Sequence, residues 1–521
     1  MRTPAPGFPE PSRCGAQHDD QQGGPPGVHG PAELVETHTS VLIFLEDLVY
    51  KVKKPVDLGF LDFRDQATRR AACEAEVELN RRLSPDVYLG VAELVCPGAR
   101  SPESLVVMRR MPAERRLSTL VTSPSPAVDI DAAVRALGRQ LAAFHSRCPT
   151  SPEIATAGDP NALRTLWQEN LSVLHHYTGQ VLNAPTVDVI DRLAMRYLAG
   201  REALLHLRQR LGLIRDGHGD LLADDVFVLD DRPRVLDCLE FDDRLRHGDV
   251  LNDVAFLAMD LERLGAPVAA RAFLDAYAEF SAEHHPRSLE DHYIAYRAGV
   301  RCKVACLRWA QGDESSAAIA RNYAELAVRH LARARVQLVL VGGLPGTGKS
   351  TLAAAISSGE GADWTLLRSD VVRKELAGIR PSESAAAAYG QGIYCPQSRR
   401  RTYDEIFTRA LHALELGESV VIDASFSSIA ERRAAAQLAE RTSAVLVELE
   451  CRAPGALVEE RLVQRAIREG RTGEASDADV AIAREMAADA DPWPSATRID
   501  TSAPISAIVR AAQAVLDTDV P

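Results

Sequence analysis

Residues 336–351 read VQLVLVGGLPGTGKST and decide the fold of the C-terminal part of this chain. An apolar run of strand character leads into the spacing G-x-x-x-x-G-K-[ST], and a helical stretch follows. In this arrangement backbone N–H groups converge on phosphates, the lysine reaches the β- and γ-phosphates, and the serine ligates Mg²⁺. We therefore predict a loop that binds ATP and Mg²⁺ through Gly343, Pro345, Gly346, Thr347, Gly348, Lys349, Ser350 and Thr351.

Five apolar runs of strand character alternate with helical stretches in this part: QLVLVGG, WTLLRSD, SVVIDAS, AVLVELE and ATRIDTS. Continuous apolar runs are typical of buried parallel strands, so we predict an α/β domain with a doubly wound parallel sheet. Asp370 is expected to end the second strand and Asp423 the third, at the edge where such sheets bind ligands. Alternatively, each aspartate only caps the following helix.

Residues 336–521 resemble the P-loop kinases of the polynucleotide kinase and gluconate kinase group. In the phage polynucleotide kinases the second strand carries Asp-x-x-Arg, which implies that Asp370 is the general base and that Arg373 holds an acceptor phosphate. By the same likeness Asp423 faces the metal or the acceptor. A helical stretch is similar to the lid of these kinases and contains Arg461, Arg465, Arg468 and Arg471. Arg465 is our choice for the catalytic lid arginine, although a row of arginines is also typical of a solvated face.

The region before residue 336 has a different pattern. Residues 41–52 predict two strands with a turn at Glu46-Asp47, followed by a helix over 71–83 and a strand over 104–108. Residues 130–210 and 249–333 have helical periodicity, with short strands around 226–229 and 234–236. This is the outline of a small nucleotide-covering lobe, residues 33–118, and a helical lobe, residues 119–335.

A second group of carboxylates lies in this region. Residues 218–225 read HGDLLADD, and Asp237 follows the apolar pair Val235-Leu236. Phosphoryl transfer to a hydroxyl group needs a base, and Mg²⁺ needs hard oxygen ligands, so carboxylates on a loop and near a strand end suit this chemistry. Carboxylates are common, and the spacing alone does not decide between this function and an ordinary loop.

These residues resemble the HGDLHxxN motif of aminoglycoside phosphotransferases, which is followed by a metal-binding aspartate at a strand end. The likeness implies an α+β protein-kinase-like domain in which Asp220 is the catalytic base, Asp237 ligates Mg²⁺ and His218 supports the loop. Leu222 and Asp225 depart from the motif, where the family has His and Asn. Asp225 can still ligate Mg²⁺, but it adds negative charge beside the triphosphate.

The predicted small lobe completes this resemblance. Lys51 stands on a strand similar to the one whose lysine contacts ATP phosphates in these kinases, and Glu76 is the implied helix partner. Lys53, Lys54 and Glu74 are competing assignments, because a shift of one residue reverses the facing of a strand. A basic, solvated strand edge is the alternative. Residues 33–521 thus resemble bacterial two-part proteins that join an aminoglycoside-phosphotransferase-like domain to an ATP-binding domain.

Acceptor specificity of this domain is expected to come from its helical lobe. Neighbouring turns carry aromatic and basic residues suited to an anionic or hydroxylated ligand: Tyr293, Tyr296, Arg297, Arg301 and Arg308. A structural helix with a charged flank is the alternative. No dense acidic stretch favours a polycationic aminoglycoside as the acceptor.

Length and composition bound these hypotheses. The chain has 521 residues, a formal net charge of −13 and nine scattered cysteines without metal-binding spacing. It shows no signal-peptide pattern and no apolar run near 18 residues, so a cytoplasmic protein without a membrane segment is expected. Residues 1–32, rich in Pro and Gly, predict a disordered tail before the domains at 33–335 and 336–521.

The leading hypothesis is a bifunctional, ATP- and Mg²⁺-dependent kinase in which both domains phosphorylate hydroxyl groups of small molecules. One alternative makes the first domain a degenerate sensing domain, which Leu222 and Asp225 favour. A second alternative, a polynucleotide 5′-hydroxyl kinase, draws on Asp370, Arg373 and the basic run at 399–401. Nucleic acid is not the expected partner, because phosphate backbones select basic proteins.

Overall fold

The computed structural model describes residues 33–37, 39–57, 62–95, 101–359, 364–380, 383, 390–472 and 480–518, of which 465–472 by backbone alone. Internal contacts divide the chain into two compact units. The first runs to Cys73 and takes in Tyr88–Arg110, and the second comprises Glu74–Val87 and Met111–Pro521. The expected tail over 1–32 lies outside the described residues.

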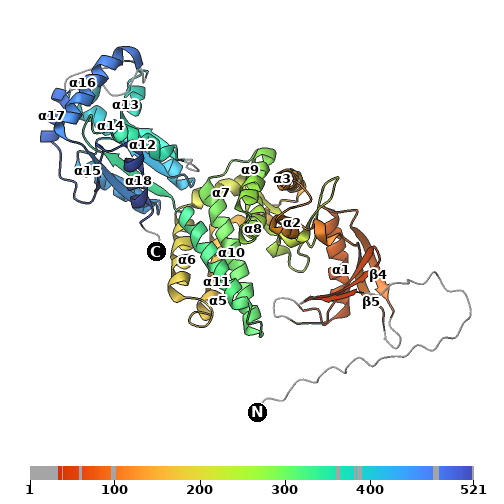
Figure 1. Ribbon diagram of the computed structural model, residues 1–521. Coiled ribbons are helices and arrows are strands. Elements are labelled where there is room, and N and C mark those ends of the chain that lie inside the picture. The colour runs from red at the N-terminus through yellow and green to blue at the C-terminus, as the bar shows by residue number, and fades with distance from the viewer. Residues whose placement is uncertain are drawn as a thin grey trace, which may run out of the picture. The chain divides into compact units, whose positions relative to one another are not determined.

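The first unit is built on an antiparallel sheet in the order β1-β2-β3-β5-β4, of which Figure 1 labels β4 and β5. The predicted hairpin is present, and Glu46 in its turn has a φ of 50°. Two strands, β1 and β4, were not predicted, because β1 is wholly exposed and Gly90 interrupts the apolar pattern of β4. The helix begins five residues earlier than predicted. The strands are β1 (Glu33–Glu36), β2 (Ser40–Leu45), β3 (Leu48–Lys53), β4 (Tyr88–Leu94) and β5 (Glu103–Arg109). The helix α1 (Gln66–Arg81) begins in the first unit and belongs to the second unit from Glu74 onward.

Helices dominate the next part of the chain, as their periodicity predicts. The buried helix α8 lies at the centre, with every residue from Val250 to Leu261 buried. The α-helices are α2 (Leu117–Thr122), α3 (Ile130–Arg147), α4 (Pro152–Ala155), α5 (Pro160–His176), α6 (Ala184–Ala199), α7 (Glu202–Arg210), α8 (Val250–Arg263), α9 (Pro267–Ser281), α10 (Arg287–Ala310) and α11 (Ser316–Arg333). Two small antiparallel ribbons pair β6 (Ile214–Asp216) with β9 (His247–Asp249) and β7 (Val226–Val228) with β8 (Pro233–Val235).

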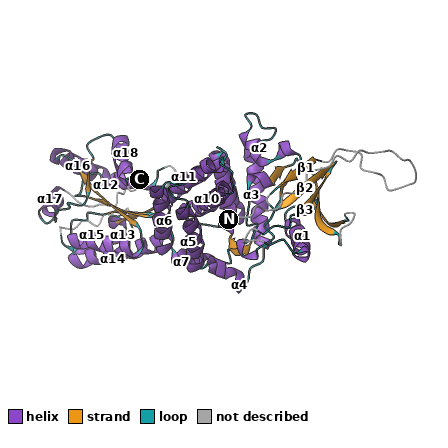
Figure 2. Cartoon of the chain, turned by 90° about the horizontal axis from the view of Figure 1, so that it is seen from below, coloured by secondary structure: helices purple, strands orange, loops and turns teal. Residues whose placement is uncertain are grey.

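The C-terminal part is the predicted doubly wound α/β domain. Its five parallel strands have the order β11-β12-β10-β13-β14, and Figure 2 shows α12 and α18 on one face and α13, α14 and α15 on the other. The strands are β10 (Gln337–Gly342), β11 (Thr365–Arg368), β12 (Val420–Asp423), β13 (Val445–Arg452) and β14 (Thr497–Asp500). The helices are α12 (Lys349–Ser357), α13 (Ser369–Leu376), α14 (Pro396–Glu415), α15 (Ile429–Arg441), α16 (Gly455–Thr472), α17 (Val480–Ala488) and α18 (Ile505–Leu516).

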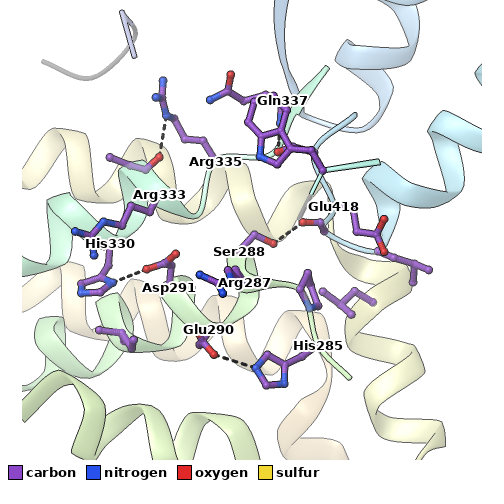
Figure 3. A pocket seen from close by; sticks show the side chains of 18 of the residues that line it. His285, Arg287, Ser288, Glu290, Asp291, His330, Arg333, Arg335, Gln337 and Glu418 are labelled. Carbon is purple, nitrogen blue, oxygen red and sulfur yellow. Dashed lines mark hydrogen bonds and ion pairs between the residues drawn. The ribbon is translucent and has the colours of Figure 1, made fainter. Parts of the chain in front are cut away.

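The helical lobe and the α/β domain share one hydrophobic cluster within the second unit. Arg196 of α6 donates hydrogen bonds to the carbonyl oxygens of Ser443 (3.0 Å) and Ala444 (2.7 Å). Ser288 donates to Gly417 O at 2.6 Å. A cavity of about 1200 Å³ adjoins these contacts and is lined by side chains of α7 to α11 and by the edges of β10 and β11 (Figure 3).

One predicted boundary is wrong. β11 ends at Arg368, and Asp370 therefore stands in the first turn of α13 and not at the end of the strand. Asp423 is the last residue of β12, as predicted. Among the described helices, none combines the length and the apolar character that a bilayer crossing needs.

Candidate active sites

The phosphate loop connects β10 to α12, and its glycines have backbone angles that other residues rarely adopt. The φ angles are 137° at Gly343, 80° at Gly346 and 84° at Gly348. A Cβ atom at Gly343 would lie 2.7 Å from Cys451 O, so the loop has no room for a side chain there. Gly348 precedes the first residue of α12, Lys349, at the helix N-terminus where anions are bound favourably.

Side chains from other elements hold this loop in shape. Thr347 Oγ1 donates to Leu344 O at 2.7 Å within the loop, and Thr501 Oγ1, after β14, donates to Thr347 O at 2.6 Å. Arg461 of α16 donates to Thr501 O at 2.8 Å. Thr501 was not predicted, because its contact with the loop spans 154 positions in the sequence. The loop is thus fixed before a nucleotide binds.

Carboxylates and guanidinium groups face each other at the neighbouring strand ends. Arg373 donates a hydrogen bond to Asp370, and Arg368 donates to Asp423 across the paired ends of β11 and β12 (3.3 Å). The Arg373 guanidinium also lies 4.8 Å from the centre of the Tyr394 ring. The parallel strands therefore bring the predicted residues to the same sheet edge as the phosphate loop.

The donor set at this edge suits Mg²⁺ bound together with ATP. Asp423 is buried, and within the described part of the chain its Oδ1 has no hydrogen-bond partner. Mg²⁺ is commonly held by one or two carboxylates and the phosphates of the substrate. Asp423 and Ser350 are the residues that would hold the ion there.

The lid prediction is tested only in part. Arg461 is a described side chain, and its place against the phosphate loop makes it a loop contact rather than a solvated residue. The predicted catalytic Arg465 stands on α16, but its side chain lies outside the described atoms, as do those of Arg468 and Arg471.

The second site is the loop that follows β6, and Asp253 of α8 organises its backbone. The Asp253 carboxylate accepts hydrogen bonds from the amides of His218 (2.7 Å) and Gly219 (2.9 Å) and from His145 Nε2 (3.0 Å). Burial works to raise the pKa of Asp253, but these hydrogen bonds and the charge of His145 hold it well below its usual range. A Cβ atom at Gly217 would lie 2.6 Å from this carboxylate, so the sequence Gly-His-Gly permits the close approach.

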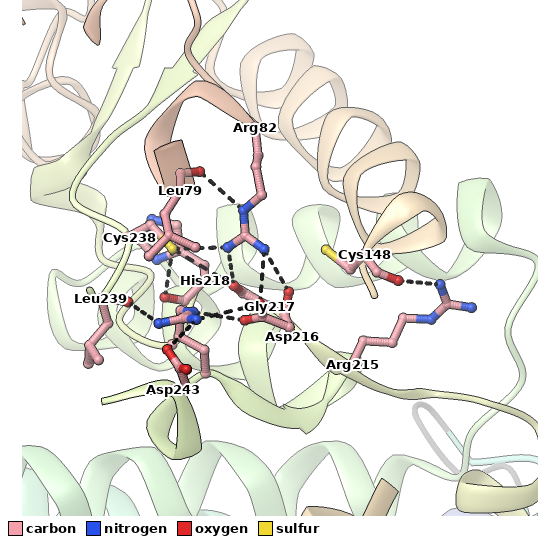
Figure 4. Close-up of polar contacts among 12 residues, drawn as sticks. Leu79, Arg82, Cys148, Arg215, Asp216, Gly217, His218, Cys238, Leu239 and Asp243 are labelled. Carbon is pink, nitrogen blue, oxygen red and sulfur yellow. Dashed lines mark hydrogen bonds and ion pairs between the residues drawn. The ribbon is translucent and has the colours of Figure 1, made fainter. Parts of the chain in front are cut away.

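Arg82, which follows α1, also holds this loop through hydrogen bonds to its backbone (Figure 4). It donates to the carbonyl oxygens of Asp216 (3.0 Å) and Gly217 (2.8 Å) and lies 3.2 Å from Cys238 Sγ. Arg246 pairs with the Asp216 carboxylate at 2.8 Å. Neither Arg82 nor Asp253 was predicted, since their contacts with the loop are distant in sequence and carry no local spacing.

His218 supports the loop, as the resemblance implied. Its Nε2 lies 3.0 Å from Leu236 O, which requires the proton on that nitrogen. Burial lowers the pKa of His218, so the imidazole is neutral near pH 7. This hydrogen bond links the loop to the segment that carries Asp237.

Asp220 has the environment of a proton acceptor. Burial raises its pKa, with the charge of Asp237 acting in the same direction. The positive charges of Arg301 and Arg297 oppose the rise. A carboxyl group whose pKa moves towards neutrality accepts a proton more readily in a transition state.

The two predicted metal ligands of this site, Asp225 and Asp237, follow Asp220 in the sequence. Asp237 has a φ of 62°, a left-handed conformation that is strained for most residues and tolerated by Asp. Asp225 ends a short turn (Ala223–Asp225), and its carbonyl accepts the amide of Leu236 at 2.9 Å. Two carboxylates suit Mg²⁺ that completes its ligands with ATP and water. Among the described side chains, no three His, Cys, Asp or Glu residues gather closely enough to hold a metal by themselves.

The three candidate lysines, Lys51 and Lys53 on β3 and Lys54 just after it, differ in their surroundings. Lys54 pairs with Glu36 at 2.6 Å, and Lys53 is buried with its ammonium 5.4 Å from the Phe63 ring centre. Lys51 is partly exposed on β3. Glu76 is buried on α1 but belongs to the other compact unit, so the implied pair with Lys51 stays a prediction.

The predicted acceptor residues of α10 divide into two groups. Tyr293 is buried and donates to Asp249 at 3.1 Å, and the ring of Tyr296 packs edge-on against Trp167. Both are core residues. Arg297 and Arg301 instead reach the loop that carries Asp220. Arg308 stands in the last turn of the helix, away from any recorded ion pair in the described structure.

A glycine-rich phosphate loop beside carboxylates and a separate His-Gly-Asp loop with two further aspartates define a protein with two kinase-like domains. Residues 46–290 match the model of the phosphotransferase enzyme family, and residues 338–492 match that of an AAA domain.

The chain is 40% identical over 472 residues to "Uncharacterized protein Rv2004c" of Mycobacterium tuberculosis. The matched stretch covers 91% of this chain and 93% of the relative. "Uncharacterized protein Mb2027c" of Mycobacterium bovis matches with the same values. The chain therefore belongs to this two-domain family, in which an aminoglycoside-phosphotransferase-like domain precedes a P-loop kinase domain.

Among solved structures, a choline/ethanolamine kinase family protein from Mesorhizobium loti is 14% identical with a TM-score of 0.38, covering 59% of this chain and 93% of that chain. A gluconokinase from Sinorhizobium meliloti 1021 is 20% identical with a TM-score of 0.25, covering 36% of this chain and 93% of that chain.

Proposed function

We propose that both domains transfer the γ-phosphoryl group of Mg·ATP to hydroxyl groups of small molecules. The observation that carries this proposal is the common edge of β10, β11 and β12. It brings a preformed phosphate loop, the pair of Asp370 with Arg373, and the buried carboxylate of Asp423 together. A cytoplasmic protein remains the expectation.

In the P-loop domain the chain supplies positioning, charge and a base. Lys349 and the loop amides hold the triphosphate, and Mg²⁺ supplies further compensation of its charge when bound. Asp370 takes the proton of the acceptor hydroxyl as its oxygen bonds to the γ-phosphorus. The bond to the β–γ bridging oxygen breaks, and ADP leaves.

In the upstream domain Asp220 has the corresponding role. Its loop is fixed by Asp253 and Arg82, so the carboxylate is held in place before the acceptor binds. Asp237 and Asp225 would hold Mg²⁺ with the triphosphate. Lys51 would contact the phosphates.

A sensing role for the upstream domain is the second candidate, and the sequence at 222 and 225 favours it. Leu222 cannot donate or accept the hydrogen bonds of a second histidine. A domain of this kind would bind Mg·ATP or an acceptor without turnover.

Transfer to polynucleotide ends has less support. Arg399, the first residue of the basic run, is paired with Glu431 at 2.6 Å and bonded to Ser427 at 2.8 Å. Its charge is thereby compensated within the protein. Nucleic acid stays outside the proposed partners.

The proposal is tested by ADP release from the full chain with sugars, aminoglycosides, nucleosides and oligonucleotides. Lys349→Ala removes charge that stabilises the transferring phosphoryl group, and we expect it to abolish the share of turnover due to the P-loop domain. Asp220→Asn should lower the upstream share roughly a hundredfold, and the double variant should retain no more than this residual turnover. Full activity of the folded double variant would contradict both assignments.

A further inference from the structure

One face of α10 lies against the loop of Asp220. Arg297 donates from Nη1 to Gly219 O at 3.3 Å and from Nε to Asn252 O at 3.1 Å. Its guanidinium also lies 4.6 Å from the centre of the Phe256 ring. Arg297 therefore uses its donors and its ring contact to bind the loop and α8. These contacts place the following turn of α10 beside Asp220.

Arg301 occupies that following turn and has few partners of its own. The hydroxyl group of Tyr323, on α11, lies near its guanidinium. Within the described residues, its Nε is buried without a hydrogen-bond partner, and no ion pair is recorded for it. A partly buried guanidinium with an unused donor is costly unless a ligand supplies the acceptor.

The carboxylates near Arg301 are already engaged. Asp260 pairs with Arg263 at 2.7 Å and accepts the amide of Ala223 at 3.0 Å. Asp220 interacts with Arg301 through charge, but its role as the base requires it to face the acceptor hydroxyl. The guanidinium of Arg301 therefore has an unused donor and a positive charge that can bind an anionic ligand at this loop.

We propose that Arg301 and Tyr323 bind an anionic group of the acceptor whose hydroxyl is presented to Asp220. The inference rests on the proposed function of the upstream domain and names its substrate class, a hydroxylated organic anion bearing a carboxylate or a phosphate. A guanidinium recognises either group through charge-assisted hydrogen bonds. It repels a polycation, so aminoglycosides are excluded as the preferred acceptor.

The kinetic test uses the full chain with Lys349→Ala, in which turnover comes from the upstream domain. Three acceptors of matched carbon number are compared: glycerol, D-glycerate and sn-glycerol 3-phosphate, with kanamycin as a polycation. We expect one of the two anions to have the lowest KM, which distinguishes carboxylate from phosphate. Arg301→Gln should raise that KM at least tenfold, the effect of losing a charged hydrogen bond, whereas the KM of glycerol, which has no anionic group, should not change.

The binding test does not depend on turnover. Inorganic phosphate is titrated into the same chain in the presence of a non-hydrolysable Mg·ATP analogue. Arg301→Gln should weaken phosphate binding at least tenfold, and Arg301→Lys should restore part of it. The control Arg321→Gln changes an exposed arginine of α11 and should leave binding unchanged.

Each outcome separates this inference from the proposed function. Equal phosphate binding by the wild type and Arg301→Gln overturns the anion site. An equal fall in kcat for all acceptors, with a shifted pH profile, also overturns it, because Arg301 would then only adjust Asp220. Phosphate binding that depends on Arg301, without turnover of any acceptor, upholds the anion site and counts against catalysis by this domain.

Discussion

The guanidinium of Arg373 lies 2.6 Å from the carboxylate of Asp370, measured from Nη1 to Oδ1, one turn apart on α13. Asp370 occupies the first turn of the helix, where the helix dipole favours negative charge. The ion pair orients both side chains before an acceptor binds. An acceptor that carries a phosphate would meet the guanidinium while its hydroxyl meets the carboxylate.

Asp370→Asn is expected to lower acceptor phosphorylation by the P-loop domain roughly a hundredfold, the usual range for a lost general base. Nucleotide affinity should change little, since the phosphate loop is held by Thr501 and Arg461. Calorimetry with Mg·ATP and ADP-release assays measure the two quantities, in a chain with Asp220→Asn. An equal loss of nucleotide affinity would make Asp370 a structural or metal-binding residue instead.

Gly343→Ala should weaken nucleotide binding at least tenfold, because the new Cβ would lie 2.7 Å from Cys451 O and force the loop to move. Gly378→Ala is the matched control. It also has a positive φ, 71°, but a Cβ atom there meets nothing within 4 Å. We expect this control to lose about 1 kcal/mol of stability and to bind nucleotide normally. An equal loss of nucleotide binding in both variants would show that the backbone strain of a positive φ is responsible, and not the contact with Cys451 O.

Asp237→Asn and Asp220→Asn should have different effects in the upstream domain. The first should weaken Mg·ATP binding, because an anionic ligand of the metal is lost. The second should leave nucleotide affinity nearly intact and lower phosphoryl transfer roughly a hundredfold. Both are measured in a chain with Lys349→Ala. The reverse pattern would exchange the two roles.

Stability should fall at alkaline pH through His285, which lies between α9 and α10 in the sequence and lines the cavity shown in Figure 3. Its Nε2 lies 3.1 Å from Glu290 and its Nδ1 3.4 Å from Glu283. Burial would lower the pKa of His285, but the two carboxylates outweigh burial and raise it to about 9 from an ordinary value of 6.5. The stabilisation is complete below pH 6.5 and is lost as the pH rises through 9.

We expect the free energy of unfolding to fall by on the order of 2–3 kcal/mol between pH 6.5 and 9.5. Urea denaturation across this range measures it. His285→Gln should flatten the dependence, whereas His284→Gln, at the exposed neighbour, should keep it. An unchanged pH dependence in His285→Gln would assign the titration to another group.

Local pattern predicted the parts of the fold whose causes are local. The run from Gln337 to Ser350 contains its strand, its glycines and the start of its helix, so both the element order and the loop followed from the sequence. Asp370 was misplaced by two residues because strand and helix meet there without a break.

Residues whose contacts are distant in the sequence could not be predicted from local pattern. Asp253 contacts the loop of Asp220 from 35 positions away in the sequence, and Thr501 contacts the phosphate loop from 154 positions away. Their roles depend on the tertiary fold. An ordinary Asp in a helix and an ordinary Thr after a strand carry no spacing that reveals such contacts.

Gly200 follows the last residue of α6, and a Cβ atom there would collide with the carbonyl oxygen of Thr442. The backbones of Gly200 and Thr442 thus pack closely without a side chain between them. Together with the hydrogen bonds of Arg196, this contact means that the α/β domain stabilises the helical lobe. We therefore expect heat that melts one of them to remove the packing of the other, so that the two denature cooperatively. A nucleotide bound to the phosphate loop would then also protect helices that it does not touch.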